Sequence, residues 1–155
     1  MLSKLKPYFI YIGMALLVGL AAGLISSPAM EDFAALKQPP LSPPGTVFPI
    51  VWTILYILMG IGAGLVASGR ISTGSPALKL YIVQLIFNFG WTIIFFNLKL
   101  RLVAFVWLLA LLGLVIAMTV HFYKVRPIAG LLQIPYILWL IFAAYLNFAI
   151  FYLNG

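Results

Sequence analysis

The chain has 155 residues, of which 65% are hydrophobic and 7% charged, and nine Lys and Arg against two Asp and Glu give a net charge of +7. Its mean hydropathy is +1.20, whereas soluble domains contain about 45–50% apolar residues. So few charges exclude a cytosolic enzyme, a nucleic-acid-binding domain and a disordered protein, and they predict a single-domain integral membrane protein.

The apolar runs predict the fold class, an all-α membrane protein built as a bundle of five transmembrane helices over residues 1–155. Five crossings of about 20 residues use roughly 100–110 residues, which leaves short loops. A β-barrel is not expected, because barrel strands alternate apolar and polar residues. The chain has no cysteine, so disulfides, thiolate nucleophiles and cysteine metal sites are excluded.

The first predicted span covers residues 8–26 and follows Lys4 and Lys6. Its apolar stretch exceeds the roughly 7–15 residues of a signal peptide, so we expect a retained helix. Residues 28–46 form a long loop that carries five prolines and both acids, Glu31 and Asp32. Proline fixes φ and removes a donor, so this loop should be stiff. The remaining spans are predicted over residues 47–68, 78–98, 102–123 and 128–153.

Basic residues in short loops predict the orientation of a membrane protein. Between these spans the N-terminal side carries six of them, and the other side carries three, Lys37, Lys99 and Arg101. The six are Lys4, Lys6, Arg70, Lys79, Lys124 and Arg126. We therefore expect the N-terminus inside and the C-terminus outside, and the basic flanks without a transit-like leader favour a bacterial plasma membrane. Charges scattered over both faces predict no nucleic-acid partner.

Three spans each carry a stripe of aromatic residues at helical spacing, and two of the stripes include amides. The stripes are Phe48, Trp52, Tyr56 and Met59; Gln84, Asn88, Trp91 and Phe95; and Tyr136, Trp139, Ala143 and Asn147. They are open to two interpretations, helix packing with amide contacts of about 0.6–2 kcal/mol or the walls of a cavity for a large planar ligand. The tryptophans concentrate in the outer half, which predicts a pocket there with loop 28–46 as its lid.

Small residues and one proline also leave alternatives open. Ala15, Gly19 and Gly23 form a ridge on the first span, and Gly60 and Gly64 form one on the second. Such ridges let helices approach closely, either within the chain or in a homodimer. Pro135, in the fifth span, predicts a kink that is either a tolerated bend or a gate.

Conventional catalytic groups are scarce. No carboxylate lies within a predicted span, and His121 is the one histidine. We therefore expect no metal site, no proton relay through the membrane and no acid–base constellation.

Three ordered motifs resemble the translocator protein family, also called tryptophan-rich sensory proteins (TspO/MBR). The first lies within PPLSPPGTVFPIVWTILY and matches at Pro39, Pro43, Pro44, Phe48, Trp52, Leu55 and Tyr56. The second matches at Gln84, Asn88, Trp91, Phe95 and Phe96, and the third at Pro135, Tyr136, Trp139, Phe142, Ala143, Leu146 and Asn147. The chain departs from the family at Asp32, Leu41 and Thr46, where tryptophans are expected, and no Lys or Arg follows Tyr145 as in the sterol motif.

The resemblance implies a membrane receptor for tetrapyrroles and related hydrophobic ligands, including benzodiazepine- and isoquinoline-type drugs and, in some members, sterols. It implies no required cofactor, a porphyrin as ligand, a lipid bilayer around the chain and a homodimer in some members. Light-dependent breakdown of protoporphyrin, known for some bacterial members, would use Trp52 and Trp139 as its catalytic residues. A transporter of porphyrin or sterol is the alternative, although no intramembrane charge or inverted repeat supports coupled transport.

We expect the ligand among the first, second, third and fifth spans. The tryptophans would stack on it, the asparagines would bind its polar edges, Ala143 would leave room, and Lys37 would lie near its carboxylates. The predicted ligand-binding residues are Pro43, Pro44, Phe48, Trp52, Asn88, Trp91, Trp139, Ala143, Leu146 and Asn147.

Overall fold

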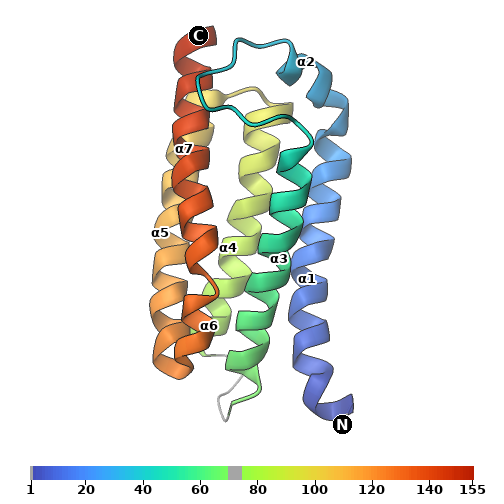
Figure 1. The fold of residues 1–155 in the computed structure, drawn as a ribbon, viewed down its shortest axis with the longest axis vertical. Coiled ribbons are helices and arrows are strands. Elements are labelled where there is room, and N and C mark those ends of the chain that lie inside the picture. The colour runs from blue at the N-terminus through green and yellow to red at the C-terminus, as the bar shows by residue number, and fades with distance from the viewer. Residues whose placement is uncertain (1, 70–74) are drawn as a thin grey trace.

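A computed structural model describes residues 2–69 and 75–155, and in these residues the chain forms helices without strands. Arg70 and most of the loop predicted between Gly69 and Pro76 lie outside the described residues. Five of the described helical segments are long and apolar enough to cross a membrane, so the predicted fold class is confirmed. The helices stand side by side, with the N-terminus at one end of the bundle and the C-terminus at the other (Figure 1).

The first helical segment is longer than predicted at both ends. Helix α1 covers Leu2–Ser26, the single-turn η1 covers Ser27–Ala29, and α2 covers Met30–Ala34. The helix begins before the predicted span, at Leu2, because Lys4 and Lys6 continue it although they do not belong to an apolar span. A crossing needs about 20 residues, so α2, which carries Glu31 and Asp32, lies beyond the crossing part. The lid loop is therefore residues 35–46 rather than 28–46.

The next three spans lie close to their predicted positions. Helix α3 covers Val47–Ala67, α4 covers Pro76–Thr92 and α5 covers Arg101–Val125. Ser75 caps α4 by accepting a hydrogen bond from the backbone N–H of Leu78, with Pro76 at the first helical position. Helix α4 continues into a π-helical turn, η2, over Ile93–Asn97. Lys99 then adopts a φ of 57° in the short turn before α5.

The fifth span is broken where the sequence predicted a kink. Helix α6 covers Pro127–Leu131, and α7 covers Ile134–Asn154 with Pro135 in its first turn. Proline has no N–H to donate and is tolerated there, so the new helix begins where its ring causes no clash. The buried Gln133 side chain fills the break and donates from Nε2 to the carbonyl oxygens of Leu58 and Ala129, at 3.4 and 3.2 Å.

Close packing of α1 against α3 explains the small-residue ridges. A Cβ added to Gly60 would collide with the backbone of Ile12, and one added to Gly64 would lie 2.6 Å from the Tyr8 ring. Both glycines of α3 thus let α1 approach closely within the chain. For the ridge of Gly60 and Gly64 this is the first of the two alternatives, helix packing inside one chain. The homodimer stays a prediction.

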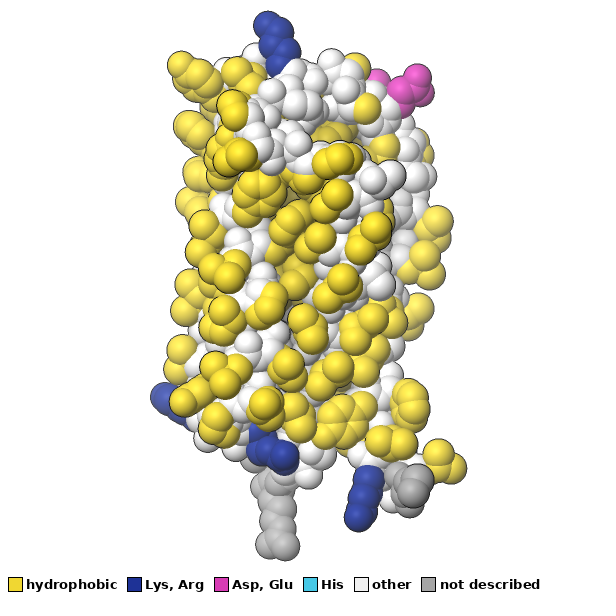
Figure 2. Space-filling model, in the orientation of Figure 1, with side chains coloured by type: hydrophobic (Ala, Val, Ile, Leu, Met, Phe, Trp, Pro, Cys, Tyr) yellow, Lys and Arg dark blue, Asp and Glu magenta, His cyan; other side chains and the backbone are white. Residues whose placement is uncertain are grey.

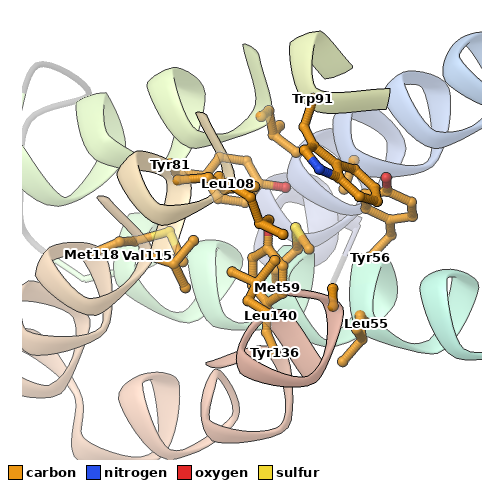
Figure 3. Close-up of a cluster of buried hydrophobic side chains, with 14 of the residues drawn as sticks. Leu55, Tyr56, Met59, Tyr81, Trp91, Leu108, Val115, Met118, Tyr136 and Leu140 are labelled. Atoms are coloured by element: carbon orange, nitrogen blue, oxygen red, sulfur yellow. The ribbon is translucent and has the colours of Figure 1, made fainter. Parts of the chain in front are cut away.

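The core lies along the bundle axis, where α3, α4, α5 and α7 meet. Its largest fully buried side chains include Met59, Tyr81, Phe122, Tyr136 and Leu140, and several of them point toward one another in Figure 3. Hydrophobic side chains cover the middle of the face shown in Figure 2, while Lys, Arg, Asp and Glu lie toward its two ends. An apolar belt between charged ends is the pattern expected of a bundle surrounded by lipid. The side of the membrane that each terminus faces stays a prediction.

Candidate functional site: an aromatic cavity beneath the lid loop

A cavity of about 1140 Å³ lies inside the half of the bundle that carries the lid loop. Helices α1, α2, α3, α4 and α7, the turn η2 and the lid loop contribute its walls. Pockets for small molecules usually measure about 300–1,000 Å³, so this volume accommodates a large ligand. None of the described residues that line it is charged. The cavity therefore favours a ligand that is mainly apolar.

Trp52 of α3 is the centre of the aromatic wall. Its ring stacks on Tyr56 with the centroids 5.6 Å apart, and it meets Trp91 of α4 at 6.3 Å. On its other side it meets Trp139 of α7 edge to face, at 6.4 Å and 90°. These separations lie in the range in which aromatic pairs attract, about 4.5–7 Å. Three tryptophans from three helices thus form a connected wall to which a planar ring can bind.

Two phenylalanines of the turn η2 extend this aromatic wall beyond the end of α4. Phe95 stacks on Trp91 at 5.5 Å, and Phe96 meets Trp91 edge to face at 6.1 Å. Both phenylalanines line the cavity, so the aromatic wall continues from α4 into η2.

A buried hydrogen-bonded network lies next to this wall. The Tyr56 hydroxyl donates to Asn88 Oδ1 at 2.7 Å, and Asn88 Nδ2 donates to the Tyr136 hydroxyl at 2.8 Å. The Tyr136 hydroxyl in turn donates to Gln84 Oε1 at 2.7 Å. Asn88, Gln84 and Tyr136 are at most 1% exposed. An unpaired polar group in such surroundings is costly, so the network fixes α3, α4 and α7 relative to one another.

Asn147 of α7 has a similar structural role at the top of the cavity. Its Oδ1 accepts a hydrogen bond from Trp91 Nε1 at 2.9 Å, and its Nδ2 donates to the carbonyl oxygen of Arg101 at 2.8 Å. These contacts hold the Trp91 ring in one orientation. The indole Nε1 of Trp139, by contrast, is buried and has no hydrogen-bond partner among the described residues.

The lid loop is fastened to α7 and, through α2, to the turn before α5. The Lys37 N–H donates to Asn154 Oδ1, and Asn154 Nδ2 donates to the Lys37 carbonyl oxygen, both at 3.0 Å. The Tyr145 hydroxyl donates to the Pro40 carbonyl oxygen at 2.6 Å. The Lys99 ammonium lies 2.8 Å from the Asp32 carboxylate, and this hydrogen bond and charge hold the pKa of that carboxyl below its usual range.

The structure brings nine of the ten predicted ligand-binding residues around this one cavity. They are Pro43, Pro44, Phe48, Trp52, Trp91, Trp139, Ala143, Leu146 and Asn147. Asn88 is the exception, because it lies behind Tyr56 with its amide oxygen and nitrogen both bonded within the protein. The exposed Lys37 is not among the described lining residues either.

Sequence reasoning did not identify which residues of the first span face the cavity. Helix α1 contributes Leu16, Gly19, Leu20, Ala22, Gly23 and Ser26. The signal was present in the small residues spaced four apart, Gly19 and Gly23. The alternative of packing within the chain fits Gly19, where an added Cβ would collide with the Tyr56 ring, whereas no described atom lies within 4 Å of one at Gly23.

Comparison with known proteins gives consistent results over most of the chain. The family model of the TspO/MBR family matches residues 10–153. The tryptophan-rich protein TspO of Chlorobaculum tepidum is 36% identical over 146 residues, which cover 92% of each chain. The translocator protein of Homo sapiens is 38% identical over 81% of this chain and 76% of its own. The tryptophan-rich sensory protein of Cereibacter sphaeroides is 37% identical over 80% of this chain and 77% of its own.

Proposed function

Because the chain belongs to the TspO/MBR family, we propose that this multi-pass membrane protein is a receptor for tetrapyrroles such as protoporphyrin IX. The observation that carries the proposal is the connected wall of Trp52, Trp91 and Trp139 along a cavity of about 1140 Å³. A tetrapyrrole is a wide, flat aromatic ring, and each stacked tryptophan contributes about 0.5–1.5 kcal/mol beyond burial. Related hydrophobic ligands of benzodiazepine or isoquinoline type fit the same wall.

The polar groups of the cavity agree with such a ligand. The lining offers hydroxyls from Ser26 and Ser42 and the amide of Gln38 toward the lid end, while the wall formed by the three tryptophans is aromatic. A ring with carboxylates on one edge would keep that edge near the lid and water and its apolar edge among the tryptophans. A buried carboxylate without a partner is costly, so the opposite orientation is disfavoured.

The proposal is tested by titrating the purified protein with protoporphyrin IX in the dark. Tryptophan fluorescence and porphyrin absorbance are followed for wild type, Trp139→Phe and Trp107→Phe. Trp107 is the matched control, because it stacks on Phe87 at 4.5 Å and is not among the described cavity-lining residues. Saturable quenching that weakens in Trp139→Phe and not in Trp107→Phe supports the proposal. Quenching that never saturates means that the porphyrin only partitions into the micelle.

Light-dependent degradation of the porphyrin is a second candidate, favoured by the contact between Trp52 and Trp139 at 6.4 Å. Indole rings beside an excited porphyrin can be oxidised, and this chemistry does not need acid–base groups. Loss of porphyrin absorbance under illumination, absent in Trp52→Phe and Trp139→Phe, would establish it. An equal loss in a dark control would contradict it.

A further inference from the structure

The contact between α1 and α3 differs between its two halves. In the half near the N-terminus the helices touch at Gly60 and Gly64, where an added Cβ would meet Ile12 or Tyr8. The last such contact toward the lid end is at Gly19, against the Tyr56 ring. Residues four apart share a helix face, so Gly23 is the next position of α1 directed toward α3.

At Gly23 the two helices have separated. A Cβ added there would meet no described atom within 4 Å, yet Gly23 lines the cavity. The neighbouring cavity-lining residues are also exposed on the outside of the bundle. Leu20 and Met30 are 59% and 39% exposed, and Pro49 and Thr53 of α3 are exposed as well. Residues that both line a cavity and face outward mark a mouth, so the cavity has one between α1 and α3, besides the one at the exposed lid residues Gln38, Pro44 and Gly45.

No described hydrogen bond joins the two sides of this mouth. The Thr53 hydroxyl donates to the Pro49 carbonyl oxygen of its own helix at 2.7 Å. The lid end of α1 is held on the other side, where Asn97 Nδ2 of η2 donates to the Ile25 carbonyl oxygen at 2.9 Å. The mouth can therefore widen without breaking a described hydrogen bond, whereas lifting the lid loop breaks those of Asn154 and Tyr145.

The mouth faces lipid rather than water. Leu20 of α1 and Pro49 of α3 border it with exposed apolar surface, and both helices belong to membrane-spanning segments. We propose that the ligand, a flat apolar amphiphile dissolved in the bilayer, enters the cavity laterally between α1 and α3, through the leaflet at the lid end. This inference rests on the proposed function, since it requires that the cavity binds such a ligand.

The test is a larger side chain at the mouth, Gly23→Leu, with Gly13→Leu as the matched control. Gly13 lies on the same helix, has no described atom within 4 Å of an added Cβ, and is not among the described lining residues. Each protein is reconstituted in vesicles, and protoporphyrin IX is delivered from porphyrin-loaded vesicles. Gly23→Leu should slow association and dissociation together by about tenfold, because an obstructed path slows both directions while affinity follows their ratio. Gly13→Leu should match wild type.

Three results would separate the alternatives. Equal rates in Gly23→Leu and wild type, with saturable binding in both, overturn the lateral path and leave the proposed function intact. Faster binding in Asn154→Ala, with no slowing in Gly23→Leu, overturns it in favour of a path through the lid. Wild type that never saturates overturns the proposed function and this inference with it.

A second measurement needs no ligand. In a Trp107→Phe background the remaining tryptophans, Trp52, Trp91 and Trp139, all line the cavity. Lipids brominated along their acyl chains quench tryptophans that they reach. Quenching should fall in Gly23→Leu and not in Gly13→Leu. Equal quenching in the two variants would contradict an opening to lipid at this position.

Discussion

Asn88 joins Tyr56 to Tyr136 across the bundle, because its Oδ1 accepts from one hydroxyl at 2.7 Å and its Nδ2 donates to the other at 2.8 Å. The amide thus connects α4 to both α3 and α7. Tyr56 also stacks on Trp52 at 5.6 Å, so the orientation of the cavity wall depends on this buried contact.

Replacing Asn88 with alanine should lower the thermal stability of the protein in detergent. The Tyr56 hydroxyl would lose its acceptor in a buried site, at a cost of about 1–3 kcal/mol. Asn97→Ala is the control, because Asn97 is exposed and its hydrogen bond to Ile25 lies at the surface. Equal melting temperatures for the two variants would show that the network contributes little to stability.

Trp52→Phe should weaken porphyrin binding more than Trp139→Phe does. Trp52 contacts Tyr56, Trp91, Tyr136 and Trp139 at 5.6–6.4 Å, so its replacement also loosens the rings around it. A loss of about 0.5–1.5 kcal/mol per ring contact raises the dissociation constant roughly two- to twelvefold. The dark titration measures both constants, and a larger effect of Trp139→Phe would reverse the order.

A larger side chain at Ala143 should reduce affinity without unfolding the protein. Ala143 is 8% exposed and lines the cavity from α7, so the phenylalanine of Ala143→Phe can extend into the open volume. Ala149→Phe is the control, since Ala149 lies on the same helix and is not among the described lining residues. Unchanged affinity in Ala143→Phe, with an unchanged melting temperature, would place the ligand elsewhere.

Gly60→Leu should separate α1 from α3 and destabilise the bundle. An added Cβ would already collide with the Ile12 backbone, which cannot rotate away, and overpacking usually costs about 1–3 kcal/mol. Gly113→Leu on α5 should be neutral, because no described atom lies within 4 Å of a Cβ there. Thermal unfolding in detergent compares the two, and similar stability would mean that α1 shifts without cost.

Asn154→Ala should loosen the lid loop. It removes the hydrogen bond to the Lys37 N–H and the one from its own Nδ2 to the Lys37 carbonyl oxygen. Hydrogen exchange at the Lys37 amide should become faster, and trypsin should cleave after Lys37 more readily. Ser68→Ala, at the other end of the bundle, is the control. Unchanged exchange would show that the contact between Tyr145 and Pro40 holds the loop by itself.

The fold was largely predictable because a helix that crosses the hydrocarbon core of a bilayer needs about 20 consecutive apolar residues, and such runs are visible in the sequence. The starts and ends of α3 and α5 fall within two residues of the predicted spans. The start of α1 was not predictable from apolarity, since a helix continues into water through Lys6 and Lys4 without needing an apolar surface. The break at Gln133 needed the structure as well, because Pro135 predicts a disturbance but not the residue at which helical bonding stops.

The walls of the cavity were predictable from spacing, and the partners of the polar groups were not. Helical periodicity placed Trp52, Trp91 and Trp139 on inward faces, where the structure also has them. It could not show that Asn88 faces two phenols rather than the open volume, because that depends on how three helices are rotated against one another. The sequence also could not show that Gly23 lines the cavity, because a glycine can face either a neighbouring helix or an open volume.

The π turn η2 over Ile93–Asn97 has a consequence for sequence length as well as for shape. Deleting one residue there would return the segment to a regular α-helix and rotate everything after it by about 100° relative to α4. The Phe95 and Phe96 side chains would then take other directions relative to Trp91, and the cavity wall would change its shape. In an alignment of relatives, a one-residue gap at this place would therefore mark a protein with a differently shaped wall, even where all four tryptophans were kept.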